Sequence, residues 1–383
     1  MPRKSEFAEG MEWLPLRVQV ACPCKRSADV IIKKDAHVLC RVSSVNPVFP
    51  TAPSFTMNDK QSIREPAIMR WEKLGLVFKL AESRLANHKN AMVPTPFLLP
   101  SGKLRVYMTV CDQANIGRIF YVEFDSVAMD GPPSEVMGPV LDVGTPGSFD
   151  EHGVVVAQIM QVSDTELWMY YSGFERLHDQ PYRILTGVAR SVDGGSSFGR
   201  NTCDPILRQS PKESLFRCAP FVLRSALGYT MWYVAGSSWE VVQGKHVPRY
   251  SLYTMHSPDG VTWPDEGLEC LKLGPNEHGF GRPWILREGG VLRLFYSIRR
   301  IDLAAYALGY AESRDGIYWQ RMDHCMGLDT SQGQFDSTAM SYTAIITTDD
   351  SLYCLYNGDN FGRDGFAAAR SPIQRLRTTS NAP

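Results

Sequence analysis

The chain has 383 residues, of which 44% are hydrophobic and 21% charged, so it is long and apolar enough to bury a core. Its 40 basic and 41 acidic residues give a formal net charge of −1, which argues against a general nucleic-acid binder. The sequence contains no run of 18 or more apolar residues, so we predict no membrane span. Nine scattered cysteines favour reduced thiols in a cytoplasmic protein over a disulfide framework.

The first 68 residues form an N-terminal extension and linker. Two stretches, "LPLRVQVAC" and "ADVIIKK", are plausible strands, and a segment rich in Pro, Ser and Asn follows them. The N-terminus lacks the apolar core of a signal peptide. Cys22 and Cys24 have too few nearby ligands for a zinc site, so we predict no metal there. The extension could pack on the next domain, close it, or remain separate.

Residues 69–375 contain a repeat of about 60 residues. Similar segments are centred on Pro96, Ala157, Pro220, Pro283 and Thr343, with separations of 61, 63, 63 and 60. Each has two short apolar runs joined by a polar turn, which predicts a β-hairpin. A third strand such as "LGYAESR" and an outer strand such as "WQRMDH" follow. Four strands in each of five repeats predict an all-β, five-bladed β-propeller. Residues 376–383 are a C-terminal tail.

A turn motif follows the third strand in three of the repeats. It reads "SVDGGSSF" at 191–198, "SPDGVTW" at 257–263 and "SRDGIYW" at 313–319. Asp-Gly favours a tight turn, and Ser can bond another amide of the loop. The final aromatic residue is a large apolar anchor between neighbouring sheets. We therefore predict a structural corner rather than a ligand contact.

Several segments resemble the glycosidase-like five-bladed propeller proteins. They are "MRWEKLGLVF", "MVPTPFLL", "FDEHGVVV", "MWYVAGSSWE", "GYAESRDGIYW" and "YNGDNFGRDGFAAA". The resemblance runs from about Met69 to Arg370. It implies an architecture shared with glycoside hydrolase families 43, 32 and 68 and with the family 130 phosphorylases. Members often occur in bacterial polysaccharide gene clusters, so the resemblance also implies a link to polysaccharide biosynthesis.

Ionisable residues lie just before the innermost strand of several repeats. Glycosidic hydrolysis needs two carboxyl groups, and Asp150, Glu151 and Asp336 are the candidates for catalysis. Each of them could instead cap a turn through backbone amides. Arabinanase-like propellers are expected to bring acids from blades one, two and three. Here blade one offers His88 and Asn90, so the three-acid pattern does not carry over.

Four arginines lie at or near blade starts or inner loops: Arg183, Arg217, Arg282 and Arg363. A guanidinium fork suits a carboxylate or phosphate, so their convergence would indicate an anionic sugar. Each could instead pair with a nearby acid such as Glu213 or Asp364. Arg282 directly precedes a repeat proline, which predicts a side chain facing the central channel.

Further candidate ligand contacts are an amide, an imidazole and aromatic rings. Asn90 and His152 could hydrogen-bond a sugar, and Trp239 and Tyr342, together with Tyr182, could stack on its face. The histidines have no metal-ligand spacing, so we expect no metal. No Walker loop, Rossmann fingerprint or nucleophile elbow is present, so we expect no cofactor.

These observations predict a carbohydrate-active enzyme that cleaves or transfers a glycosidic bond in the propeller funnel. Its ligand would be a small molecule or oligosaccharide, in particular an anionic or phosphorylated sugar. Two alternatives stay open. One is a non-catalytic propeller that binds a glycan or sugar phosphate, which the missing acids favour. The other is a biosynthetic enzyme that uses the same scaffold for non-hydrolytic chemistry.

Overall fold

The computed structural model describes residues 66–303 and 305–373, which lie in one unit spanning 61–383. Most of the predicted extension, with Cys22, Cys24 and both of its predicted strands, lies outside the described residues. The predicted tail at 376–383 lies outside them as well.

The described residues form an all-β structure, as predicted. Twenty strands, β1 to β20, are joined by turns and loops. The helical segments are single turns: η1 (Leu80–Glu82), η2 (Asp323–Met326) and α1 (Asp359–Gly362). No helix among these residues is long and apolar enough to cross a membrane.

Antiparallel pairing groups the strands into five successive sets of four. Set 1 holds β2 (Asn90–Leu98), β3 (Leu104–Cys111), β4 (Gly117–Phe124) and β5 (Met137–Leu141). Set 2 holds β6 (Val154–Gln161), β7 (Leu167–Glu175), β8 (Arg183–Ser191) and β9 (Gly199–Arg200). Set 3 holds β10 (Phe216–Ser225), β11 (Gly228–Val242), β12 (Lys245–Ser257) and β13 (Leu268–Leu271). Set 4 holds β14 (Glu277–Glu288), β15 (Val291–Arg300), β16 (Ala305–Ser313) and β17 (Gln320–Arg321). Set 5 holds β18 (Ser341–Thr347), β19 (Ser351–Asn357), β20 (Gly365–Pro372) and β1 (Glu72–Lys79).

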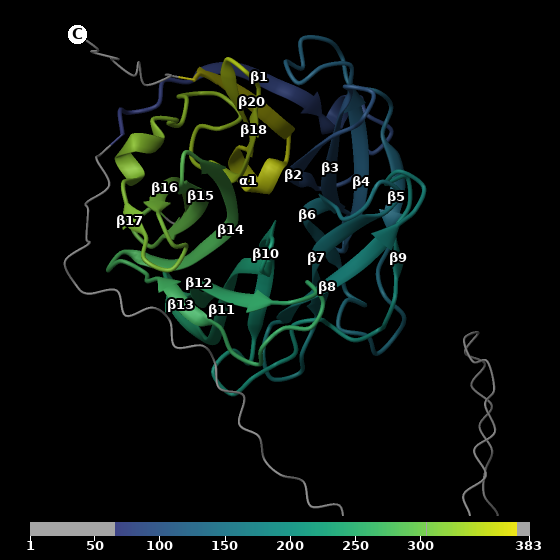
Figure 1. The fold of residues 1–383 in the computed structure, drawn as a ribbon, viewed down its shortest axis with the longest axis vertical. Helices are drawn as coiled ribbons and strands as arrows, with labels where there is room; N and C mark the ends of the chain where they lie inside the picture. Colours follow the sequence, from purple (N-terminus) through teal and green to yellow (C-terminus); the bar gives the residue numbers. More distant parts are fainter. Residues whose placement is uncertain (1–65, 304, 374–383) are drawn as a thin grey trace, which may run out of the picture. The chain divides into compact units, whose positions relative to one another are not determined.

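The five repeat positions identified in the sequence all fall on the first strand of a set, so the hairpin repeat is confirmed. Each first strand contacts the first strand of the next set, and β18 contacts β2. In Figure 1 these first strands lie nearest to a common centre. Their side chains are therefore the ones that can meet a single ligand.

The outer strand of set 5 comes from the other end of the described chain. β1 pairs antiparallel with β20, from Glu72 opposite Arg370 to Lys79 opposite Gly365. The two strands lie side by side at the top of Figure 1. Residues from the beginning and the end of the repeat region thus share one sheet.

Polar side chains on second strands link one set to the next. Each accepts a hydrogen bond from a backbone amide on the neighbouring first strand. The pairs are Val156 N to Thr109 Oγ1 (3.0 Å), Ala219 N to Ser172 Oγ (2.9 Å), Tyr342 N to Ser297 Oγ (2.8 Å) and Val93 N to Asn357 Oδ1 (2.7 Å). Sets 3 and 4 meet instead through the parallel pairing of Tyr250 with Gly279. Buried amides are satisfied in this way at the points where the sets meet.

All five first strands carry a register shift, which includes the repeat position in four of them and lies just before Pro96 in β2. Four of these shifts contain a non-glycine residue with positive φ: Val93 (60°), Ala219 (50°), Arg282 (34°) and Tyr342 (60°). Such residues lie in a sparsely populated backbone region, which packing must hold in place. Bulges also re-aim side chains, so these positions present Arg282 and Tyr342 out of the regular strand alternation.

The predicted corner motif is confirmed by its hydrogen bonds. In the second copy, Asp259 Oδ1 accepts from the amides of Val261 (2.9 Å) and Thr262 (2.7 Å), and Ser257 Oγ accepts from Gly260 N (2.9 Å). The preceding set fastens each corner through an aromatic donor. The donors reach glycine carbonyls as follows: Tyr107 to Gly195 (2.8 Å), Tyr170 to Gly260 (2.9 Å) and Trp232 to Gly316 (2.8 Å). The motif therefore joins neighbouring sets.

Candidate functional site

Asp150 occupies a closed, ion-paired position. Its side chain is fully buried, and its Oδ2 accepts from Tyr171 Oη (2.9 Å) and Arg200 Nε (2.7 Å). Its Oδ1 accepts from Ser148 Oγ (2.8 Å). Tyr171 lies on the second strand of set 2 and Arg200 on the outer strand, so the carboxylate joins the strands of its own set.

Asp336 has the same surroundings in set 5. It is fully buried, and its Oδ2 accepts from Lys73 Nζ (2.6 Å) and Tyr356 Oη (3.2 Å). Tyr356 again lies on the second strand and Lys73 on the outer strand β1. This arrangement of an acid, a second-strand tyrosine and an outer-strand base is called the acid–tyrosine–base network below. Two of the predicted catalytic carboxylates therefore lie at equivalent points of the repeat.

Two of the other three sets hold variants of this network. In set 3, Glu213 Oε2 accepts from Tyr233 Oη (2.7 Å) and pairs with Arg217 Nε (2.7 Å). In set 4, Arg321 of the outer strand bonds Glu277 through both carboxylate oxygens (2.9 and 2.7 Å). Because the acid and its counter-ion recur in four sets, we interpret these ion pairs as stabilising the repeated sheets.

Glu151 differs from its neighbour Asp150 because its side chain is partly exposed. One carboxylate oxygen accepts from Gly147 N (2.8 Å), and the other lies 3.4 Å from His152 Nδ1. Both side chains belong to the loop before β6. The Oδ1 atom of Asn90, at the start of β2, is buried and has no hydrogen-bond partner among the described residues. These three groups remain open to a ligand.

Three of the four predicted arginines are neutralised by carboxylates. Arg183 pairs with Glu175, Arg217 with Glu213, and Arg363 with Asp364. The pairing with nearby acids that the sequence left open is therefore what the structure contains. These guanidinium groups are poor candidates for a shared anion site.

Arg282 is buried at the meeting point of three first strands. Its Nη1 donates to the carbonyls of Pro94 (2.6 Å) and Tyr342 (3.1 Å), and its Nη2 donates to Thr95 Oγ1 (2.8 Å). No ion pair among the described residues includes it. Burial lowers its pKa to about 9. Its terminal nitrogens are used to join strands of sets 1, 4 and 5, and a channel-facing role for this side chain stays a prediction.

Arg299, at the end of β15, is the arginine that the sequence reasoning missed. It is partly exposed and takes part in no ion pair among the described residues. Its guanidinium lies over the rings of Tyr250 (5.5 Å) and Tyr306 (4.9 Å) and donates to the Tyr306 hydroxyl. It also interacts electrostatically with Tyr182 and Tyr342. We call Arg299 and these four tyrosines the tyrosine cage.

Strands from four sets build the tyrosine cage. Tyr182 directly precedes β8, and Tyr250, Tyr306 and Tyr342 lie on β12, β16 and β18. Burial raises the pKa of Tyr250 and Tyr342 well above the ordinary value, so the phenols stay neutral. Burial tends to lower the pKa of Arg299, but the surrounding phenols outweigh it and raise that pKa. The cage thus holds one persistent positive charge.

An aromatic wall continues from the cage. Tyr182 lies 4.9 Å from Trp239 between ring centroids, and Phe216 lies 5.3 Å from Trp239 and 5.4 Å from Tyr250. Beyond Trp239 is a pocket of about 480 Å³. Polar side chains on its lining include Asp179, Gln180, Ser237, Ser238 and His246. Of these rings, Tyr182 and Trp239 are partly exposed, while Phe216 and Tyr250 are buried behind them. Partly exposed aromatic faces next to polar groups are typical of sugar-binding surfaces.

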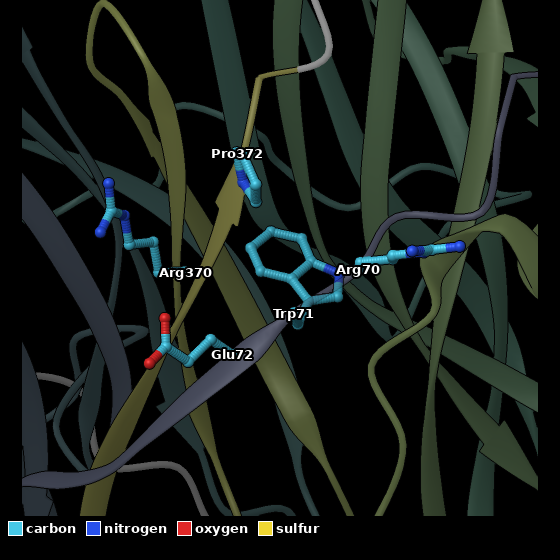
Figure 2. Close-up of a pocket in the computed structure, with 5 residues that line it drawn as sticks. All are labelled: Arg70, Trp71, Glu72, Arg370 and Pro372. Atoms are coloured by element: carbon cyan, nitrogen blue, oxygen red, sulfur yellow. The ribbon is translucent and has the colours of Figure 1, made fainter.

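A second pocket lies on the outermost pair of strands of set 5, not on the first strands. Its volume is about 440 Å³, and Figure 2 shows the five residues that line it: Arg70, Trp71, Glu72, Arg370 and Pro372. The indole of Trp71 donates to Met326 O (2.7 Å). This pocket contains none of the predicted site residues. No cluster of His, Cys, Asp and Glu in the described part of the chain has the makeup of a metal site.

Solved structures with the same arrangement of strands are carbohydrate-active proteins. A glycoside hydrolase superposes with a TM-score of 0.62 and 18% identity, covering 79% of this chain and 92% of that one. The fold is that of the glycosidase propellers. A thermostable family-43 glycoside hydrolase with this propeller fold gives a TM-score of 0.53 and 15% identity, covering 74% and 89% of the two chains. The predicted resemblance is confirmed at the level of fold.

Other relatives extend the comparison of glycosidase propellers. A structure from work on β-1,2-mannoside-targeting hydrolases in the GH130 mannoside phosphorylase family gives a TM-score of 0.60 and 13% identity, covering 80% of this chain and 95% of that one. By sequence, the uncharacterized protein Rv1502 of Mycobacterium tuberculosis is 28% identical over 305 residues, which are 79% of this chain and 99% of the relative. No family model matches the chain.

Proposed function

We propose that the five sets are the five blades of a closed β-propeller, and that the chain is a carbohydrate-active enzyme that cleaves or transfers a glycosidic bond at the propeller centre. The ring is supported by contacts between successive first strands, including β18 with β2, and by the hydrogen bond from Val93 N to Asn357. The fold shared with glycoside hydrolases supports the reaction class, although a fold by itself does not carry chemistry.

One observation carries the proposal: the tyrosine cage gathers side chains from four sets around a single partly exposed cation. Arg299 has no carboxylate partner among the described residues, while Arg183, Arg217 and Arg363 each have one. An uncompensated, partly buried charge is costly unless a ligand completes it. The aromatic wall offers faces on which a sugar ring can pack. Together they favour an anionic sugar as the ligand.

Glu151 is the proton-transferring carboxyl group in this proposal. It is the member of the predicted catalytic trio with a partly exposed side chain, since Asp150 and Asp336 are fully buried. It would protonate the glycosidic oxygen or activate the attacking group, which is water or phosphate. His152 and Asn90 would hydrogen-bond the sugar beside it. Asp150, through Ser148, Tyr171 and Arg200, would hold the loop that carries Glu151 and His152.

A non-catalytic sugar-binding propeller is the second candidate, and a specific observation favours it. Asp150 and Asp336 are fully buried and are paired with the counter-ions Arg200 and Lys73, although Asp336 Oδ1 has no hydrogen-bond partner among the described residues. Glu151 is then left without the second carboxyl group that glycosidases ordinarily need.

Product formation separates the two candidates. The full chain is incubated with a panel of uronic-acid-containing and neutral oligosaccharides, with and without inorganic phosphate, and products are identified by mass spectrometry. The enzyme proposal expects a shortened product that Glu151→Gln reduces at least about 100-fold. The matched control is Glu135→Gln, an exposed glutamate in the segment before β5. Saturable binding with no product from any member of the panel would support the binding protein instead.

A further inference from the structure

The tyrosine cage has a definite charge. Arg299 contributes one positive charge, and burial raises the pKa of Tyr182, Tyr250 and Tyr342, so these phenols carry no charge at neutral pH. Tyr306 already accepts a hydrogen bond from the guanidinium. The cage is therefore a singly charged receptor with aromatic walls.

The other ionisable groups around Arg299 do not add a second charge. Burial lowers the pKa of His278, and the nearby charge of Arg299 lowers it further, although the bond with the Pro248 carbonyl opposes both effects. His278 therefore stays neutral near pH 7. Burial raises the pKa of the Cys218 thiol to about 12, so it remains protonated. Arg249, which also faces His278, is paired with Glu240 at 2.7 Å.

Arg282 cannot serve as a second anion receptor without breaking the framework. Its side chain is 3% exposed, and both terminal nitrogens already donate to groups on β2 and β18. Moving them toward a ligand would leave buried carbonyls without donors. Arg299, by contrast, is partly exposed, and so are Tyr182 and Tyr342 beside it.

We infer that the tyrosine cage binds the carboxylate of a uronic or ulosonic acid residue and discriminates against sugar phosphates. This inference rests on the proposed function and names its substrate class. A carboxylate carries one negative charge and presents two coplanar oxygens, which match one guanidinium fork. A phosphate monoester carries about −1.5 to −2 charge at pH 7, so in this cage it would keep an uncompensated charge in a poorly hydrated site. The tyrosine rings then contact the apolar face of the sugar.

Binding is measured by isothermal titration of the full chain with D-glucuronate, D-galacturonate and N-acetylneuraminate. Matched neutral sugars are D-glucose and D-galactose, and matched phosphates are glucose 1-phosphate and inorganic phosphate. We expect at least one acid to bind roughly 10-fold or more tightly than its neutral or phosphorylated counterpart, which corresponds to one charge-assisted hydrogen-bonded pair. Equal or tighter binding of the phosphates would overturn the inference.

Ligand chemistry also predicts a pH profile. A sugar carboxyl group resembles an α-carboxyl group with a pKa of about 3.3–3.7, so the ligand keeps its charge from pH 5 to 8. The second ionisation of a phosphate ester has a pKa of about 6, so a phosphate gains negative charge as the pH rises through the same range. His278, whose pKa is lowered by burial, can gain a proton only toward the acidic end of this range, where it would favour an anion. Acid binding that stays level or weakens as the pH rises supports the carboxylate, and acid binding that strengthens with a midpoint near pH 6 contradicts it.

Variants of Arg299 and Tyr306 test whether the tyrosine cage binds the carboxylate. Arg299→Lys retains the charge but loses the fork, and we expect an intermediate loss of acid binding, while Arg299→Gln loses most of it. Arg300→Gln is the matched control because Arg300 is the next residue and pairs with Asp302. If Arg299→Gln does not fold, Tyr306→Phe, which removes the hydroxyl at the guanidinium, serves as the second variant. Undiminished acid binding by a folded Arg299→Lys or Tyr306→Phe protein would overturn the assignment.

The outcomes for the two proposals are distinguishable. If a sugar acid binds in an Arg299-dependent way but no product forms, the enzyme proposal is wrong and the inference holds. Product from neutral oligosaccharides, with no preference for acids, sinks the inference and leaves the enzyme proposal standing.

Discussion

The acid–tyrosine–base network and the tyrosine cage both combine tyrosines with a basic residue. In the network the charges compensate one another, whereas in the cage the positive charge is left without a carboxylate. In the network, Asp150 meets Arg200 at 2.7 Å and a tyrosine hydroxyl at 2.9 Å, so the charge is satisfied inside one set. In the cage, the tyrosines surround Arg299, and no ion pair of the described residues neutralises it. A charged residue at a repeat position is therefore a weak indication of a ligand site. A charge without a counter-ion is a stronger one.

Breaking the acid–tyrosine–base network should cause the largest loss of stability. Asp150→Asn leaves the Arg200 guanidinium without its anion in a buried site, and we expect a loss of about 3 kcal/mol in the free energy of unfolding. Glu151→Gln, at the adjacent and partly exposed residue, should lose no more than about 0.5 kcal/mol. Urea unfolding of both full-length variants measures the difference. Equal losses would mean that the network is not what separates these neighbours.

The next largest effect concerns ligand affinity. Arg299→Gln should weaken binding of the preferred sugar acid roughly 30-fold, the loss expected for a charged hydrogen-bonding group. Arg363→Gln should change it by less than about 2-fold, because Arg363 is exposed and already paired with Asp364. Titration calorimetry at fixed ionic strength tests both. A larger loss for Arg363→Gln would show that the compensated arginines bind the ligand.

A smaller effect separates the tyrosines of the two regions. Tyr171→Phe removes the hydroxyl that donates to Asp150, and we expect a loss of about 1 kcal/mol in stability and no change in sugar binding. Tyr342→Phe should change stability less, since its hydroxyl is 3.5 Å from that of Tyr306, and should weaken sugar binding. Thermal unfolding and calorimetry on the same samples reveal whether the two effects divide in this way.

The smallest effect belongs to the corner motif and disappears in acid. Burial tends to raise the pKa of Asp259, but the amides of Thr262 and Val261 and the hydroxyls of Thr262 and Ser257 outweigh it and lower the pKa to about 2. The ionised form therefore stabilises the fold above the unfolded pKa of about 3.9, and this stabilisation disappears as the pH falls toward 2. Asp259→Asn should be less stable than wild type at pH 6 and equally stable at pH 2. A stability difference that persisted at pH 2 would contradict this account.

Much of the fold could be predicted from local sequence. Asp-Gly turns, alternating apolar residues and a period near 60 reflect short-range chemistry, and the hairpins and corners followed from them. The partner of β20 could not be predicted in this way, because β1 lies almost 300 residues away and its pairing depends on the whole set.

The candidate site was less predictable, since sequence shows residue types but not their partners. Arg183, Arg217 and Arg363 looked similar to a ligand arginine until their carboxylates were located. Arg299 stood in "YSIRR", at the end of an ordinary strand, and its tyrosines come from four different sets. Only the prediction that Tyr182 and Tyr342, with Trp239, could stack on a sugar pointed toward this region beforehand.

The most direct test of the central claim is a crystal structure of the full chain with the sugar acid that binds most tightly. We expect the carboxylate to lie within hydrogen-bonding distance of both terminal nitrogens of Arg299. We also expect the sugar to pack against Tyr182 or Tyr342. A carboxylate bound to Arg183 or Arg363, or a sugar seated away from the tyrosine cage, would contradict it.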